Sequence, residues 1–132
     1  MIFQEGTLFQ ETFHLTESTY KGFIELFEDR NPLHTDADFA GQKGFDGVVM
    51  HGNILNGFLS YFIGECLPTK DVIIHSQNIQ FKNPVYKNDR LAFEAKVSNV
   101  FESVNAVEFN FNFKNTEGRI AAKGKIQIGV LT

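Results

Sequence analysis

The alternation of apolar and polar residues predicts a strand and then an amphipathic helix at the start of the chain. Residues 7–14 partly alternate between the two kinds, as they do in a half-buried strand. Thr16 can accept a hydrogen bond as the N-cap of a helix. The apolar residues that follow have the spacing of one helical face: Tyr20, Phe23, Ile24 and Phe27.

Pro32 sets the expected end of this helix, because proline disfavours helical geometry in the residue before it. We therefore expect the helix to end near Asp29 or Arg30. Residues 31–51 contain three glycines and predict a loop of about twenty residues, with at most one short helical turn at 36–40. Loops of this length are usually functional or disordered. Two histidines and several acidic residues favour function here.

Residues 52–67 predict a second helix, which Pro68 ends. Apolar residues repeat at helical spacing along it: Ile54, Leu55, Phe58, Leu59, Phe62 and Ile63. A helix that is apolar on most of its surface is expected in a core. It is too short to span a membrane comfortably.

The rest of the chain predicts four strands. They cover residues 71–81, 90–101, 104–114 and 119–131, each rich in β-branched or aromatic residues with some alternation. Residues 115–118 predict the turn of a hairpin between the last two. We therefore expect an α+β fold in which a curved antiparallel sheet, with these four strands as a meander, wraps around the buried central helix. A homodimer that joins sheet edges would cover the edge such a sheet leaves open.

Composition narrows the class of protein. A chain of 132 residues fits one domain, 1–132, and 42% hydrophobic with 21% charged residues is typical of a folded protein. A net charge of -4 argues against a nucleic-acid partner. The single cysteine, Cys66, cannot form an internal disulfide, and the sequence contains no signal-peptide or membrane-span pattern. We expect a cytoplasmic protein with no membrane partner.

Asp29 and His34 are the first candidates for chemistry. The turn at Asn31-Pro32 between them can bring carboxylate and imidazole together. Glu28 and Asp29 fall at the negative end of the first helix, which disfavours a charged carboxyl group and suits proton transfer. The alternative is structural: Asp29 caps the turn by accepting backbone N–H bonds, and His34 only packs.

His51 and Gly52 stand at the start of the central helix and form the second candidate site. The first N–H groups of a helix have no internal partner and lie at its positive end, so they could bind the oxyanion of an enolate. The alternative is a plain helix start where glycine serves close packing. Ser60, within the predicted helix, is expected as a core hydroxyl rather than a nucleophile.

A metal site is not expected. His34, Asp36 and Asp38 have the spacing H-x-D-x-D, which matches no calcium loop, and His51 belongs to no HExxH motif. The sequence also lacks the glycine-rich motifs that bind nucleotides. We expect no metal and no organic cofactor.

The segments EDRNPLHTD (28–36), VMHGNIL (49–55) and FKNPVYKNDRL (81–91) resemble the MaoC-like dehydratase family, especially its single hot-dog (R)-specific enoyl-CoA hydratases. The resemblance spans roughly residues 5–130 and implies a hot-dog fold. It also implies a homodimer with active sites near the subunit interface.

By position, the resemblance implies catalytic roles for Asp29 and His34 and a backbone oxyanion donor at Gly52. It further implies supporting or substrate-binding roles for Asn31, His51, Asn53 and Ser60, and for Ser60 specifically a place near the acyl pocket. Asn53 stands where the family often has methionine, which could change the preferred acyl group.

The implied reaction is reversible addition of water to a trans-2-enoyl thioester, giving an (R)-3-hydroxyacyl thioester. The carrier of the acyl group would be coenzyme A or acyl carrier protein, and the sequence does not choose between them. Two alternatives stay open: a hot-dog acyl-CoA thioesterase, and a subunit of this fold that binds acyl thioesters without catalysis.

Overall fold

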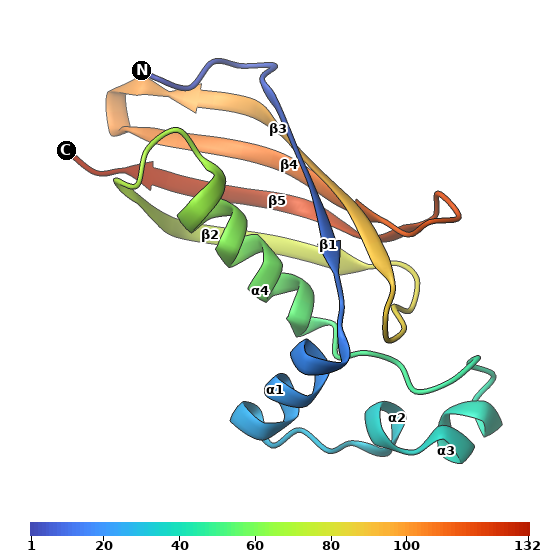
Figure 1. Cartoon of the computed structure of the whole chain (residues 1–132). Coiled ribbons are helices and arrows are strands. Elements are labelled where there is room, and N and C mark those ends of the chain that lie inside the picture. The colour runs from blue at the N-terminus through green and yellow to red at the C-terminus, as the bar shows by residue number, and fades with distance from the viewer.

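A curved five-stranded antiparallel sheet is the frame of the protein (Figure 1). The structure is a computed structural model that describes residues 1–132. The strands are β1 (Leu8–His14), β2 (Val72–Phe81), β3 (Arg90–Phe101), β4 (Ala106–Lys114) and β5 (Ile120–Val130), in the order β1-β3-β4-β5-β2. A short 3-10 turn, Glu102–Val104, joins β3 to β4.

Helix α4 (Asn53–Tyr61) lies against one face of this sheet and continues as a π-helical turn, Phe62–Cys66 (Figure 1). The three other helices lie beyond one end of the sheet: α1 (Glu17–Phe27), α2 (Pro32–Thr35) and α3 (Ala37–Gln42). No helix combines the length and apolar character that a membrane crossing requires.

The core lies between α4 and the concave side of the sheet. β4 alternates as its sequence predicts, with Phe109, Phe111 and Phe113 buried and Asn110 exposed. The ring of Phe62, from the π-helical turn, lies 4.9 Å from the ring of Phe93 on β3. Each fully buried phenylalanine contributes about 1.5–3 kcal/mol, so these rings fix the helix on the sheet.

The central helix is confirmed, but only one side of it is buried. Ile54, Leu55 and Leu59 are buried, whereas Ser60 and Tyr61 are exposed. The expectation that Ser60 is a core hydroxyl is therefore wrong. Its position in the helix is polar because that side of α4 faces away from the sheet.

The predicted meander is wrong for β2. Strands β3, β4 and β5 do follow one another as antiparallel neighbours, but β2 pairs with β5 at the opposite edge from β1. The link after β2, residues 82–89, crosses the ends of β5 and β4 and is tied down by hydrogen bonds such as Lys82 N–H to Ala121 O at 2.8 Å. Alternation of side chains fixes the buried face of a strand but not its neighbour.

Local caps also change the segment between α1 and α4. Helix α1 ends at Phe27, before the expected Asp29 or Arg30, because Glu28 is left-handed (φ 60°) and donates its N–H to Ile24 O. The expected loop holds two short helices instead of one turn. Asn31 Oδ1 accepts the N–H of Leu33 at 3.0 Å and so starts α2.

The second of these helices, α3, coincides with the expected turn at 36–40 and extends to Gln42. Asp36 Oδ1 accepts the N–H groups of Asp38 and Phe39 at 3.0 and 3.2 Å and so caps it. An N-cap of this kind stabilises a helix by about 0.5–2 kcal/mol, which makes such short helices possible.

Candidate active site

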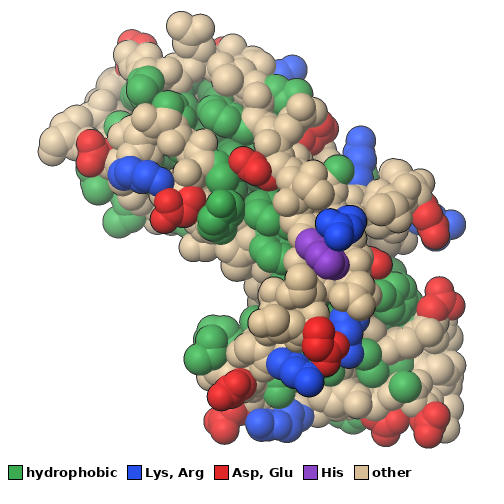
Figure 2. All heavy atoms as spheres, viewed as in Figure 1, with side chains coloured by type: hydrophobic (Ala, Val, Ile, Leu, Met, Phe, Trp, Pro, Cys, Tyr) green, Lys and Arg blue, Asp and Glu red, His purple; other side chains and the backbone are tan.

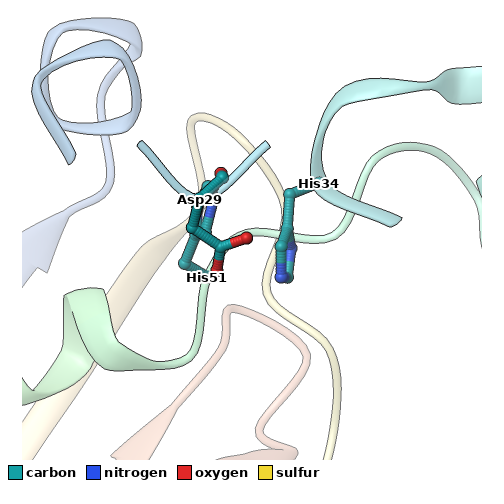
Figure 3. A group of neighbouring side chains, drawn as sticks. All are labelled: Asp29, His34 and His51. Atoms are coloured by element: carbon teal, nitrogen blue, oxygen red, sulfur yellow. Dashed lines mark hydrogen bonds between the residues drawn. The ribbon is translucent and has the colours of Figure 1, made fainter. Parts of the chain in front are cut away.

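Asp29, His34 and His51 meet where α1 ends and where α2 and α4 begin (Figure 3). One carboxylate or ring-nitrogen atom from each lies within 4.8 Å of the others. The carboxylate of Asp29 points toward the imidazole of His34. Asp29 is exposed, His34 is half-buried and His51 is buried. The expected convergence of Asp29 and His34 is thus present in the structure.

Asp29 is oriented by the turn that follows α1. Its Oδ1 accepts the N–H of Asn31 at 3.2 Å, so the capping function considered for it exists. The one other hydrogen bond to Asp29 goes to its main-chain oxygen, so Oδ2 has no partner in the protein. One oxygen therefore holds the turn while the other is available to a water molecule or substrate.

His34 is fixed by its Nδ1 atom, which lies 2.6 Å from the main-chain oxygen of Val49. A carbonyl oxygen only accepts hydrogen bonds, so Nδ1 carries the hydrogen and Nε2 keeps a lone pair. The hydroxyl of Tyr20 donates to the main-chain oxygen of His34 and so fixes the backbone of this residue. His34 can consequently exchange a proton only at Nε2.

The start of α4 supplies free N–H groups beside this pair. Gly52 is the N-cap of the helix, and neither its N–H nor that of Asn53 has an acceptor within the protein. Such groups lie at the positive end of the helix and favour an anion. Close packing is present as well, because a Cβ at Gly52 would lie 2.9 Å from the ring of Phe81.

Two cavities meet at the site. The smaller, of about 400 Å³, is lined by His34, Gly52 and Lys82 among others. The larger, of about 830 Å³, includes Asp29 and is walled by apolar side chains of α1 and α4. Asn53 is the one residue that lines both. The carboxylate and the imidazole thus face each other across the boundary between the two cavities.

Comparison with known proteins places the chain in a family. Residues 2–117 match the model of the MaoC like domain. The chain belongs to this family. The chain is 32% identical to the "(R)-specific enoyl-CoA hydratase" of Aeromonas caviae over 78% of its own length and 77% of the relative. It is 26% identical to an Arabidopsis thaliana mitochondrial "3-hydroxyacyl-[acyl-carrier-protein] dehydratase" over 91% and 73%.

Solved structures agree with this MaoC-like assignment. The (R)-hydratase of Aeromonas caviae superposes with a TM-score of 0.89, covers 98% of both chains and is 26% identical. An R-hydratase of Pseudomonas aeruginosa gives 0.87, with 26% identity and coverage of 98% of this chain and 83% of the other. The hot-dog fold expected from the sequence is confirmed.

The supporting residues implied by resemblance are only partly gathered around the MaoC-like site. His51 and Asn53 lie in it, and Asn31 holds Asp29 through its N–H. Ser60 is exposed and lines neither cavity, so this chain does not place it beside Asp29 and His34.

Tyr20 is a part of the site that sequence reasoning missed. Its position on the apolar stripe of α1 predicts a core residue, and it is buried. The signal that was available is its hydroxyl, because a buried tyrosine usually needs a hydrogen-bond partner.

Lys87 packs over the ring of Tyr20. Its Nζ lies 4.8 Å from the centre of the Tyr20 ring and 2.7 Å from the carboxylate of Glu17. The hydrogen bond from Lys87 lowers the pKa of Glu17.

Proposed function

We propose that this chain adds water reversibly to a trans-2-enoyl thioester and forms an (R)-3-hydroxyacyl thioester. The observation that carries the proposal is the pairing of Asp29 and His34 Nε2 beside the free N–H of Gly52. An acid–base pair next to an anion-binding N–H is the set of groups that this reaction needs.

In the forward reaction one water molecule lies between Asp29 and His34. One group takes a proton from the water as its oxygen bonds to C3, while the other group holds that water by a hydrogen bond. The same proton is then delivered to C2, so the pair returns to its starting state and water has been added as OH and H. Meanwhile the Gly52 N–H binds the thioester oxygen, on which enolate charge develops. Acid–base catalysis contributes typically 10²–10⁴-fold, roughly, and one oxyanion donor about 3–4 kcal/mol.

Hydration of crotonyl-CoA by the purified protein tests the proposal. Asp29→Asn and His34→Ala should each lower kcat by about 10²-fold or more. Asp38→Asn is the matched control, because Asp38 is an exposed acid on the nearby α3 that lines neither cavity. Turnover that survives both active-site substitutions would remove the chemistry from this pair, and chiral analysis of the product checks the (R) configuration.

The same assay separates the two alternatives. A thioesterase would release free coenzyme A, and a binding subunit would take up acyl-CoA without turnover. Neither of the two side chains that could form an acyl-enzyme by thiol or hydroxyl attack is available for thioester cleavage at the site. Partial burial raises the pKa of the Cys66 thiol to about 11, so it stays protonated at neutral pH, and Ser60 lines neither cavity.

We propose that the acyl chain enters the larger cavity and the carrier arm the smaller one. The larger cavity has apolar walls made of Phe23, Leu26, Phe27, Ile54 and Phe58. The smaller cavity contains Lys82, a cation that suits the phosphate of coenzyme A or of an acyl carrier protein. The substrate would then cross from one to the other beside Asn53. Kinetics with the same acyl group on both carriers distinguishes them.

We propose a homodimer formed through the β2 edge. This ten-residue edge strand is exposed along most of its length, including Ile73 at 51% and Phe81 at 51%. Apolar side chains also remain at the surface over α4 (Figure 2). Edge strands with exposed apolar residues readily pair with another chain. Ile74→Lys should give a monomer by light scattering, whereas Gln10→Lys, on the β1 edge, should leave the assembly unchanged.

We propose that the enzyme needs no metal and no organic cofactor, and that it works in the reducing cytoplasm. The support against a metal is ring geometry: the imidazoles of His34 and His51 are stacked 4.0 Å apart at 29°. A metal lies in the plane of each ring that binds it, and stacked rings share no such point close to both. Unchanged hydration of crotonyl-CoA after dialysis against EDTA is the expected result.

The single unpaired cysteine, Cys66, supports the proposed location in the reducing cytoplasm.

A further inference from the structure

His51 differs from every other polar residue of the protein in its burial. It is the one charged or polar residue among the buried ones, with 3% of its surface exposed. Burial of such a side chain is costly unless its polar atoms are paired. The contacts of its two ring nitrogens therefore show what the residue does.

The Nε2 atom of His51 lies 2.9 Å from the main-chain oxygen of Asp29. Because that oxygen only accepts, Nε2 carries the hydrogen and donates it. This is the one hydrogen bond that ties Asp29 to a distant part of the chain, since its other bond comes from Asn31 within the same turn. Asp29 is exposed and lies outside any helix, so this bond fixes the main chain from which its carboxylate projects.

Two other rings pack against the ring of His51. The ring of His34 lies 4.0 Å away at 29°, and the ring of Phe23 from α1 lies 4.6 Å away at 37°. His51 consequently holds α1, the turn with Asp29 and the imidazole of His34 in one arrangement. Its Nδ1 atom is buried and has no partner in the protein, so it cannot pass a proton to a substrate in this arrangement.

We infer that His51 is a positioning residue that sets the distance between the carboxylate of Asp29 and the imidazole of His34. This rests on the proposed catalytic roles of those two residues. The hydrogen bond matters more for Asp29 than the stacking does for His34. His34 is held independently by Val49 and Tyr20, whereas Asp29 has no second anchor outside its own turn.

Two substitutions that differ by one methylene group separate this function from simple packing. In His51→Gln the amide nitrogen can reach the position of Nε2 and donate to Asp29 O. In His51→Asn it reaches only the position of Nδ1. Both variants lose the aromatic ring, so any loss from stacking is common to the two. His51→Phe keeps the ring and lacks the donor.

In crotonyl-CoA hydration, kcat should be about tenfold or more lower for His51→Asn than for His51→Gln. KM should differ between the two by less than about threefold, because residue 51 is 3% exposed and offers the substrate little surface. His51→Phe should resemble His51→Asn in kcat although its ring restores the thermal midpoint. Equal kcat values for Gln and Asn, or a loss confined to KM, would overturn the inference.

Asp29→Asn in the same series distinguishes failure of the positioning function of His51 from failure of the catalytic role of Asp29. If Asp29→Asn is inactive while the Gln and Asn variants of His51 are equal, the positioning function is refuted and the proposed reaction stands. If Asp29→Asn retains full activity, the catalytic role of Asp29 fails and the function of His51 fails with it.

Discussion

Replacing Gly52 by alanine separates an oxyanion donor from a packing requirement, because the structure supports both. The backbone at Gly52 has a φ of -57°, which alanine adopts without strain. The added methyl group would lie 2.9 to 3.1 Å from three atoms of the Phe81 ring, so that ring must move. The N–H itself is retained.

The loss of stability follows from this contact. Adding a methyl group to a packed position costs typically about 1–3 kcal/mol. The contacting atoms belong to the outer part of a side chain and not to the backbone, so we expect the lower end, about 1 kcal/mol. Leucine at position 81 removes the contacting ring atoms. Gly52→Ala should therefore unfold earlier than the wild type in urea, and Gly52→Ala with Phe81→Leu should regain the stability of Phe81→Leu alone.

Catalysis should behave differently. Gly52 lines the smaller cavity, so the added methyl group would reduce the space through which a thioester carbonyl approaches the free N–H groups. A carbonyl kept from the N–H by about 1 Å costs about 10²-fold in rate. We expect kcat for crotonyl-CoA to fall by that order in Gly52→Ala and to stay low in the double variant. Recovery of kcat in the double variant to the value of Phe81→Leu would show that Gly52 serves packing alone.

Three further predictions concern residues around the pair. Tyr20→Phe should lower the free energy of unfolding by about 1 kcal/mol and kcat severalfold, because the main-chain oxygen of His34 loses its donor; urea unfolding and hydration kinetics check this. Asn53→Met should shift kcat/KM toward longer apolar acyl groups, because its amide lies between the cavities; a series of enoyl-CoA lengths checks this. Lys87→Met should destabilise above pH 4.5 and less as the pH falls below it, because Lys87 lowers the pKa of Glu17 and protonation of Glu17 ends their attraction; thermal midpoints against pH check this.

The elements of the fold follow from the sequence more fully than their arrangement does. Buried rings at Phe109, Phe111 and Phe113 follow from alternation, and the buried side of α4 follows from helical spacing. The partner of β2 does not, because alternation is the same whichever strand lies beside it. Caps such as Asp36 could have been found, because aspartate before a short segment is a typical helix start.

At the site, the sequence predicts that Asp29 and His34 converge, which the structure confirms, but it does not predict what holds them. Asp29 and His34 follow from a local turn, and Gly52 from a helix start. The bonds from Tyr20 to His34 and from His51 to Asp29 join segments 14 and 22 residues apart through main-chain oxygens. Every residue offers a main-chain oxygen, so no side-chain pattern marks the acceptor. Only the fold shows which one a buried donor reaches.

The two helix ends at the site carry partial charges of opposite sign, which polarise the site. The carbonyl end of α1 lies on the side of Asp29, and the N–H end of α4 lies at Gly52. These ends carry roughly half an elementary charge each, negative at the first and positive at the second. During hydration, positive charge moves onto the acid–base pair as it takes a proton, and negative charge moves onto the thioester oxygen. Each helix end stabilises the developing charge beside it, because the two have opposite signs. The fold therefore favours the charge separation that accompanies water addition.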